Sequence, residues 1–309
     1  MAEHAKYFTD ERAQRMYMIR TIVLKVLVYL FLSIFALFMI IPFVVMVVGS
    51  FIEPSAFFKF ERSADFSCLG FANWTGDNYA TILQYNSPNV GTFPIFFLNT
   101  FIVAIAGTVV TVVTAVLAAF AFARLNFKGK NALFALLLAT MMIPGEMMVI
   151  TNFTTVQEIG WMNTFAALIL VHGVSVFYIF YLRQTFQQIP NELYLAAKVD
   201  GVGDIGYLIK VMVPIAMPTI TTIIILSMMG SWNSFVWPNL VADGKWALNP
   251  DYPMYLVSNG LRKLFEVLGA GNDSVKIAGS MVISIPLLIV FILFRKYIMR
   301  GVSRSGIKG

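Results

Sequence analysis

Side chains that carry out acid–base, nucleophilic or metal chemistry are scarce in this sequence of 309 residues. Its two histidines are His4 and His172, and its single cysteine is Cys68. The H-E-x-x-H and G-x-S-x-G patterns of hydrolases do not occur, nor does the GxxxxGK[ST] pattern of a nucleotide-binding loop. Because an enzyme needs a convergent set of such groups, the sequence predicts no catalytic residue, no metal site and no cofactor bound by this chain.

Two ionisable side chains, Glu146 and His172, lie within long apolar stretches. A charge is costly to bury there unless it is paired or functional. Glu146 follows Pro144 and Gly145, so it is either a carboxylate at the outer water boundary beside a bend or part of a solute path. For His172 we favour a hydrogen-bonded position between helices. Proton-coupled carriers generally use a relay of such groups. Their scarcity here disfavours a carrier of that kind, so if the chain transports a solute, we expect the energy to come from outside this chain.

Aromatic and amide side chains are concentrated in residues 230–238, which read GSWNSFVWP. Such groups bind sugars well because a sugar ring has apolar C–H faces and a polar edge. The segment therefore suits a sugar path, although tryptophans also form the interfacial belt of most membrane proteins. The candidate solute-path residues are Glu146, Asn152, Trp232, Asn233 and Trp237.

A second polar segment, residues 189–204, reads IPNELYLAAKVDGVGD and predicts a short helix. Pro190 suits a first helical turn, and Glu192 complements the positive end of the helix dipole. Gly201 suits the end of the helix. A helix of this kind, lying between two membrane spans, could transmit rigid-body motion from a soluble partner to those spans.

The spacing within this helix suggests a contact face. Leu193, Ala197 and Asp200 follow at intervals of four and three residues and would share a face, as would Tyr194 and Ala197. The small Ala196 and Ala197 side chains would let the helix lie in a groove of another protein. The predicted coupling residues are Glu192, Leu193, Ala196, Ala197, Asp200 and Gly201.

Positioning these groups requires helices that cross a membrane. The chain is 59% hydrophobic and 12% charged, with a mean hydropathy of +0.78, which is typical of an integral membrane protein. The net charge of +6 does not predict nucleic-acid binding, because Lys and Arg are scattered between the apolar runs. Since about 20 helical residues span a bilayer, the sequence predicts an all-α fold with six spans, at residues 26–51, 94–123, 132–150, 164–182, 214–237 and 275–294.

The distribution of positive charge predicts the orientation. With six spans, 16 of the 22 Lys and Arg fall in the N-terminal segment, the second loop, the fourth loop and the tail, and six fall in the opposite loops. Positive residues are retained on the cytoplasmic side, so both termini are expected to be cytoplasmic. The first span lacks a cleavage site and is expected to be an uncleaved anchor. The two longest loops, 52–93 and 238–274, then lie outside and are expected to form lids or docking surfaces.

The loop at 189–204 resembles the signature of a known family, the permeases of binding-protein-dependent ABC importers with the MetI-like fold. Ala196, Ala197, Asp200 and Gly201 match the A-A-x-x-D-G core of that signature, about 100 residues from the C-terminus. The residue before the two alanines is glutamate in the family and Leu195 here, so no role of that glutamate is transferred to Leu195.

Other segments extend the resemblance over most of the chain, to the carbohydrate branch of the family and its shorter maltose-type permease subunit. Their order and spacing match as well as their residues. They are Asn99-Thr100, Ala121–Leu125, Met142–Glu146, Leu182-Arg183-Gln184, Pro214 with Pro218, and the tail from Arg300 to Gly309.

The resemblance implies a six-helix subunit of a multi-pass protein in a bacterial or archaeal plasma membrane. A second, similar permease would complete the path for a sugar or oligosaccharide. Two ATP-binding subunits would bind ATP and Mg, one of them holding residues 189–204 as a coupling helix, and an extracellular or periplasmic solute-binding protein would deliver the solute. The implied divisions are an N-terminal segment (1–25), a first helix with its external loop (26–93), the permease core (94–298) and a tail (299–309). A stand-alone secondary carrier is the alternative, and it would show an internal inverted repeat.

Overall fold

The computed structural model describes residues 11–63, 66–87 and 90–303, which are largely helical. Four helical stretches in them are long and apolar enough to cross a membrane, at Arg15–Ser50, Phe93–Ala123, Asp204–Trp232 and Asp273–Arg295. They correspond to the first, second, fifth and sixth predicted spans. The helices that contain them are α1 (Glu11–Ser50), α4 (Phe93–Ala123), α11 (Val213–Trp232) and α14 (Asp273–Ser303).

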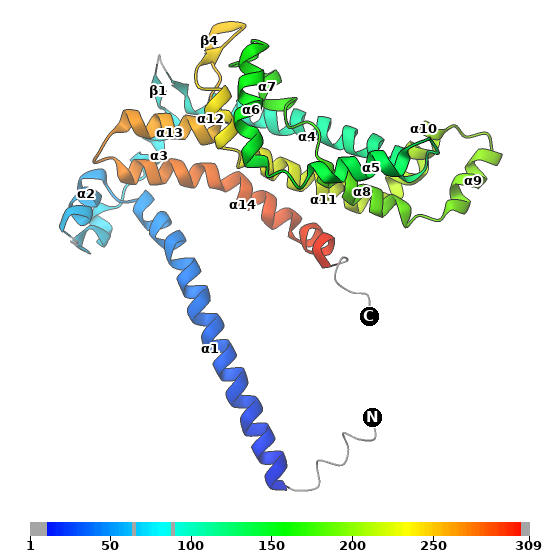
Figure 1. Ribbon diagram of the computed structural model, residues 1–309. Helices are drawn as coiled ribbons and strands as arrows, with labels where there is room; N and C mark the ends of the chain where they lie inside the picture. Colours follow the sequence, from blue (N-terminus) through cyan, green and yellow to red (C-terminus); the bar gives the residue numbers. More distant parts are fainter. Residues whose placement is uncertain (1–10, 64–65, 88–89, 304–309) are drawn as a thin grey trace.

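The helix α1 leaves the rest of the molecule at its C-terminal end and extends away from the bundle (Figure 1). It packs against α14, and Ser50 at its C-terminal end is hydrogen-bonded to Asn78 and Tyr79 of α3 (Asp77–Leu83). Apolar side chains cover it on every side, and Phe38 is 76% exposed. A helix that is apolar all round is stable when lipid or another membrane helix surrounds it, so this exposure is typical of a membrane span.

The third predicted span, 132–150, is not a straight helix. It is divided between α5 (Lys130–Thr140) and α6 (Gly145–Glu158), which meet at a bend of 94°. Pro144 causes this break, because it lacks an N–H group and disfavours helical geometry in the residue before it. Its own backbone is extended, at φ −58° and ψ 130°. Counted as one bent span, the pair brings the membrane-capable segments of the described chain to five.

The fourth predicted span, 164–182, is also interrupted. It is divided between α7 (Phe165–Ile169) and α8 (Val176–Gln187). Thr164 begins α7 by accepting a hydrogen bond from the Ala167 N–H, and Ser175 begins α8 by accepting one from the Tyr178 N–H. Side-chain caps of this kind satisfy backbone donors that a helix start leaves free, so hydroxyl residues mark two helix starts inside one apolar run.

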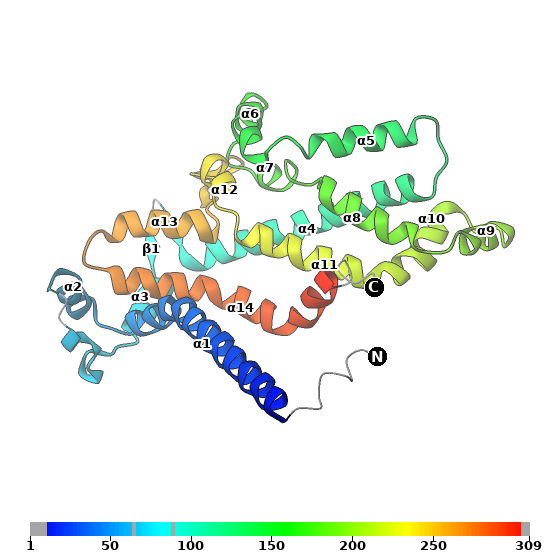
Figure 2. The ribbon, with the colours of Figure 1, turned by 60° about the horizontal axis from the view of Figure 1, so that its bottom comes forward.

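Three helices, α4, α8 and α11, lie side by side and form the centre of the molecule (Figures 1 and 2). One core cluster between them contains Ala119 from α4, Leu182 and Phe186 from α8, and Ile223 from α11, all at most 3% exposed. Close packing of small and large side chains fixes the relative positions of these helices. The bundle is therefore a rigid frame that connects its two ends.

One end of this bundle carries the segment that follows α8. It consists of α9 (Asn191–Val199), α10 (Asp204–Tyr207) and a π-helical turn, η4 (Leu208–Met212), which runs directly into α11. Pro214 near the start of α11 has no N–H to donate to the carbonyl four residues earlier. The wider hydrogen-bond spacing of η4 immediately precedes this proline.

The other end carries the two long loops, which fold into short elements. The first loop contains α2 (Pro54–Ser63), η2 (Phe66–Leu69), η3 (Phe71–Asn73), α3 (Asp77–Leu83) and the antiparallel pair β1 (Asn86–Ser87) and β2 (Gly91–Thr92). The second contains α12 (Val236–Val241), the antiparallel pair β3 (Lys245–Trp246) and β4 (Asn249–Pro253), and α13 (Val257–Leu268).

Two buried amides fix the second loop. The Asn99 side chain of α4 donates to the carbonyls of Pro253 and Tyr255, at 2.9 and 3.0 Å. Within the loop, Asn259 donates to the carbonyls of Pro238 and Ala242, at 3.1 and 2.7 Å. Buried polar groups are stable when they are hydrogen-bonded, so Asn99 holds this loop on the bundle and Asn259 holds its parts together.

Two of the predicted segments lie partly outside the described residues. These parts are the first ten residues of the predicted N-terminal segment and residues 304–309 of the predicted tail.

Candidate functional site

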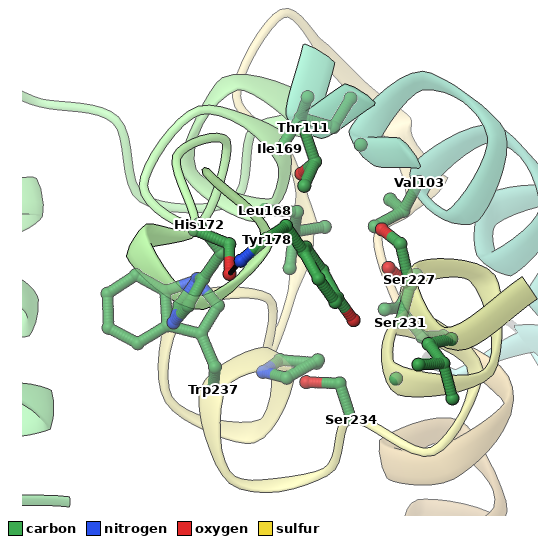
Figure 3. Close-up of a pocket in the computed structure, with 16 residues that line it drawn as sticks. Val103, Thr111, Leu168, Ile169, His172, Tyr178, Ser227, Ser231, Ser234 and Trp237 are labelled. Carbon is green, nitrogen blue, oxygen red and sulfur yellow. Dashed lines mark hydrogen bonds between the residues drawn. The ribbon is translucent and has the colours of Figure 1, made fainter. Parts of the chain in front are cut away.

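A cavity of about 210 Å³ lies among α4, the α7–α8 turn, α8, α11 and α12. Hydroxyl side chains, an imidazole and an indole line much of it (Figure 3). The lining residues are Val103, Gly107, Thr111, Leu168, Ile169, His172, Ser175, Tyr178, Leu226, Ser227, Gly230, Ser231, Ser234, Trp237, Pro238 and Leu256.

The wall formed by α4 contains Val103, Gly107 and Thr111. Residues four apart lie on one face of a helix, so this spacing gives the cavity one continuous wall. A Cβ atom on Gly107 would lie 3.9 Å from the Ser231 Oγ of α11. One turn away, Thr108 donates to the Ser227 hydroxyl across 3.2 Å. The two helices therefore meet through small and hydroxyl residues.

The turn between α7 and α8 supplies a second wall because it approaches α4 closely. A Cβ atom on Gly173 would lie 2.7 Å from the Val110 Cγ1, so a side chain there would require one of the two residues to move. The Thr114 hydroxyl donates to the Gly173 carbonyl across 2.9 Å. This contact places His172 on one side of the turn and Ser175 on the other, both at the cavity.

An aromatic group closes part of the cavity. The Trp237 indole N–H donates to the Ala167 carbonyl across 3.0 Å, and its ring lies 5.2 Å from the His172 ring in an edge-on arrangement. In Figure 3, the Tyr178 ring projects between this pair and the α11 side chains Ser227 and Ser231. Aromatic faces beside hydroxyl groups are the combination that binds a sugar ring.

The predicted solute-path residues are dispersed. Trp237 lines the cavity. Glu146 is exposed and Asn152 is half-buried, and both belong to α6, which contributes nothing to the lining. Asn233 is exposed and its amide donates to the Met229 carbonyl across 2.9 Å.

Trp232 packs in the protein core and not at the cavity. It is 6% exposed and contacts the rings of Phe97 and Phe101 on α4, with centroids 5.8 and 5.1 Å away. Its indole N–H donates to the Ile283 carbonyl of α14 across 3.2 Å. Trp232 therefore joins three helices, whereas Trp237, five residues later, faces the cavity.

Sequence reasoning missed the hydroxyl lining. Ser227, Ser231 and Ser234 follow at intervals of four and three residues at the end of an apolar run, and this spacing is the signal that could have found them. Thr111 and Tyr178 carry no comparable signal, because they reach the cavity through the packing of α4 against α8.

The predicted coupling residues lie together on α9 and its C-terminal turn. Glu192, Leu193, Ala196, Asp200 and Gly201 are exposed, as predicted for a contact surface. Ala197 is buried at 9% exposure. The three residues Leu193, Ala197 and Asp200 therefore do not form one exposed surface, because α9 lies on the end of the bundle and Ala197 packs inward.

The inward face of α9 consists of Ala197 and Tyr194, whose ring lies 5.0 Å from that of the buried Tyr207. The pairing of these two residues on one face is confirmed. The outward face carries Leu195 and Val199, which are 55% and 88% exposed. One alanine thus faces the bundle and the other, Ala196, faces away from it.

The end of α9 is fixed by a small polar cluster. Asp204 accepts a hydrogen bond from the Tyr194 hydroxyl and forms an ion pair with the Lys198 ammonium, each at 2.7 Å. The bond to Asp204 raises the pKa of Lys198 above its ordinary value. Gly201, between these residues, has a φ of +75°, a left-handed conformation that glycine adopts without strain.

Comparison with known proteins agrees with this architecture. Residues 111–304 match the family described as the binding-protein-dependent transport system inner membrane component. The arabinooligosaccharides transport system permease protein AraQ of Halalkalibacterium halodurans is 31% identical over 235 residues, which cover 76% of this chain and 80% of AraQ.

Two solved structures have the same fold. A chain of a bacterial ABC transporter involved in the import of the acidic polysaccharide alginate superposes with a TM-score of 0.72 and 22% identity, covering 93% of this chain and 98% of that one. A chain of a bacterial alginate ABC transporter, in complex with a pentasaccharide-bound periplasmic protein, superposes with a TM-score of 0.58 and 15% identity. It covers 93% of this chain and 97% of that one.

The family match covers well over half of the chain and includes α9, most of the cavity-lining residues and α14. The proteins of this family are membrane subunits of ABC transporters and not enzymes. The apolar helices described above agree with a multi-pass protein of the plasma membrane. The chain therefore belongs to the family of binding-protein-dependent transport system inner membrane components, the permease subunits of ABC importers with the MetI-like fold.

Proposed function

We propose that this permease and a second, similar one enclose the membrane path for a carbohydrate, which an extracellular or periplasmic solute-binding protein delivers. Two further subunits bind ATP and Mg and drive the cycle. AraQ, whose name refers to arabinooligosaccharides, and the alginate importers support a carbohydrate solute. The complex with a pentasaccharide-bound periplasmic protein supports the delivery step.

The observation that carries this proposal is the chemistry of the cavity. Its lining combines the hydroxyls of Thr111, Tyr178 and four serines with the Trp237 ring and contains no Lys, Arg, Asp or Glu. Hydroxyls exchange hydrogen bonds with a sugar's edge, and an aromatic face covers its C–H surface. This lining suits an uncharged sugar unit.

The second functional surface is the coupling helix, α9 with its C-terminal turn. In this proposal, Glu192, Leu193, Ala196, Asp200 and Gly201 contact an ATP-binding subunit, and Ala197 supports them from the bundle side. The exposed Leu195 and Val199 side chains, four residues apart, add an apolar stripe to this surface. The receiving groove is therefore apolar opposite Leu195, where other permeases of this kind present a glutamate.

The proposed topology has six membrane crossings, with both termini cytoplasmic. The bent α5–α6 pair serves as the third crossing and the interrupted α7–α8 segment as the fourth. The uneven distribution of Lys and Arg between the loops supports this orientation. In this topology, residues 1–25 are the N-terminal segment, 26–93 the first helix and external loop, 94–298 the permease core and 299–309 the tail.

The experiment is to purify the chain through an affinity tag in mild detergent and to identify the proteins that co-purify. The complex is then reconstituted in liposomes with its binding protein and offered a panel of neutral and acidic oligosaccharides. Uptake that requires ATP and the binding protein is the expected result. Flux by the chain alone, without ATP, would overturn the proposal in favour of a secondary carrier.

A further inference from the structure

Two arginines tie the ends of α4 and α8 together in opposite directions. Arg124, directly after α4, donates from Nη2 to the Phe186 carbonyl near the end of α8, across 2.9 Å. Arg183 on α8 donates from Nε to the Phe122 carbonyl near the end of α4, across 3.1 Å. Each cation lies at the negative end of the other helix's dipole, which is a favourable position.

Of these two arginines, only Arg124 also contacts the start of the coupling helix. Its Nη2 also donates to the Ile189 carbonyl, and its Nη1 donates to the Asn191 side-chain oxygen across 3.4 Å. These two acceptors are the linker before α9 and the first residue of α9. The guanidinium of Arg183 lies instead over the Phe134 ring of α5, 3.9 Å from its centre. The two arginines thus share the α4–α8 contact and differ in the contact to α9.

The geometry suits a guanidinium in particular. Arg124 bonds three acceptors on two segments, which a planar group with five donors can do and a single ammonium cannot do as well. Its environment is tight, because the Arg124 Nε is buried without a hydrogen-bond partner among the described atoms. The side chain is therefore held in one orientation by α8 and the start of α9.

The far part of α4 forms a wall of the solute cavity. This helix runs without interruption from Phe93 to Ala123 and has no proline in its interior beyond the first turn. Val103, Gly107 and Thr111 on it line the cavity. Because α4 is unbroken between Thr111 and its last turn, a displacement of its last residues also displaces the cavity wall.

We propose that Arg124 is a positioning residue for energy coupling, which fastens the start of the coupling helix to α4 so that motion of α9 reaches the cavity. The inference rests on the proposed function. Without Arg124, the ATP-binding subunits still bind α9 and hydrolyse ATP. The movement of α9 then displaces the cavity wall less than in the wild type. Transport per ATP hydrolysed falls, and assembly of the complex is retained.

The test compares Arg124→Gln with the matched variant Arg183→Gln in the reconstituted importer. ATP hydrolysis and sugar uptake are measured in the same liposomes, and their ratio is the readout. We expect the ratio to fall about five- to tenfold in Arg124→Gln, in the range of ordinary coupling free energies. The ratio in Arg183→Gln stays near that of the wild type, and Arg124→Lys recovers part of it.

Two results would overturn the inference. One is an unchanged ratio in Arg124→Gln, and the other is an equal loss in Arg183→Gln, which would assign the effect to the α4–α8 contact in general. If the complex with Arg124→Gln does not assemble, the same ratio is measured in Asn191→Ala, which removes one acceptor on α9 and leaves Arg124 in place. A lowered ratio in that variant supports the inference, and a wild-type ratio rejects it. Wild-type complex without ATP-dependent uptake would instead refute the proposed function.

Discussion

The middle and the end of α4 lie in functional surfaces that are built differently. In the middle, Val103, Gly107 and Thr111 face a cavity assembled from several segments that are far apart in the sequence. At the end, Arg124 contacts residues 186–191, one continuous segment that leads into α9. The cavity is thus a product of tertiary packing, whereas the coupling surface is a single short helix. Changes at these two places should therefore have different consequences.

The largest expected effect is at the coupling end, from Gly201→Val. A left-handed backbone costs a residue with a side chain about 1–2 kcal/mol, and the added side chain also stands on the docking surface. We expect ATP-dependent uptake to fall about tenfold or more, with the membrane helices still inserted. Uptake in liposomes and recovery of the complex measure the two properties.

Gly203→Val is the matched control, because Gly203 has a φ of −68° and nothing within 4 Å of an added Cβ atom. A valine is compatible with that backbone. Similar losses in the two variants would mean that the left-handed turn at Gly201 is not what the partner requires.

The two tryptophans of the segment 230–238 sharpen the contrast between core and cavity. Trp232→Ala should lower the free energy of unfolding by about 3 kcal/mol, because it leaves a hole among α4, α11 and α14. Trp237→Ala should lower stability by a similar amount, because Trp237 is also 6% exposed, and should in addition weaken sugar-dependent uptake. Thermal unfolding of the complex and uptake as a function of sugar concentration measure the two effects. Uptake weakened no more in Trp237→Ala than in Trp232→Ala would contradict the assignment of Trp237 to the solute path.

A smaller effect is expected from the hydroxyl wall. In Ser227→Ala/Ser231→Ala, the apparent affinity for the transported sugar should fall about two- to tenfold per lost hydrogen bond, since such bonds contribute about 0.5–1.5 kcal/mol. Ser284→Ala is the control, because Ser284 is exposed on α14, outside the cavity lining. Equal affinity in the double variant and the wild type would exclude these serines from sugar contact.

The smallest expected effect is on stability, at Glu61 in α2 of the first long loop, outside the cavity lining and the coupling helix. Partial desolvation of the carboxylate, followed by the nearby Asp273 carboxylate, raises the pKa of Glu61 above its usual 4.5, against the opposing charge of Lys276. Stability is then greatest when Glu61 is protonated, below its usual pKa, and declines as pH rises through the raised pKa.

Glu61→Gln mimics the protonated group at every pH. At pH 7 we expect it to raise the Tm by about 1 °C or less, since Glu61 is exposed and solvent screens its charge. At pH 4 the difference from the wild type should vanish. A constant difference across this range would argue against a raised pKa.

The coupling helix could be predicted from the sequence and the cavity could not, because the first depends on local signals and the second on packing. The helix at 189–204 was predicted from local signals, namely Pro190, the two alanines and Gly201, and the structure forms α9 there. The long spans were predicted from hydropathy. The bend beside Pro144 was predicted from that proline, although 132–150 was predicted as one span. The interruption near Gly173 was not predicted, because it depends on which neighbour the chain approaches, and Gly173 lies close to Val110. The cavity was missed for the same reason.

The role of the cavity can be followed directly while the ATP-binding subunits work. A Ser231→Cys substitution, in a Cys68→Ser background, places one thiol of this chain on the cavity wall of the reconstituted importer. We expect its rate of modification by an impermeant maleimide to change when ATP binds, while the rate at a Ser284→Cys control stays constant. An unchanged rate at position 231, in a complex that transports sugar, would contradict the claim that this cavity is the driven part of the path.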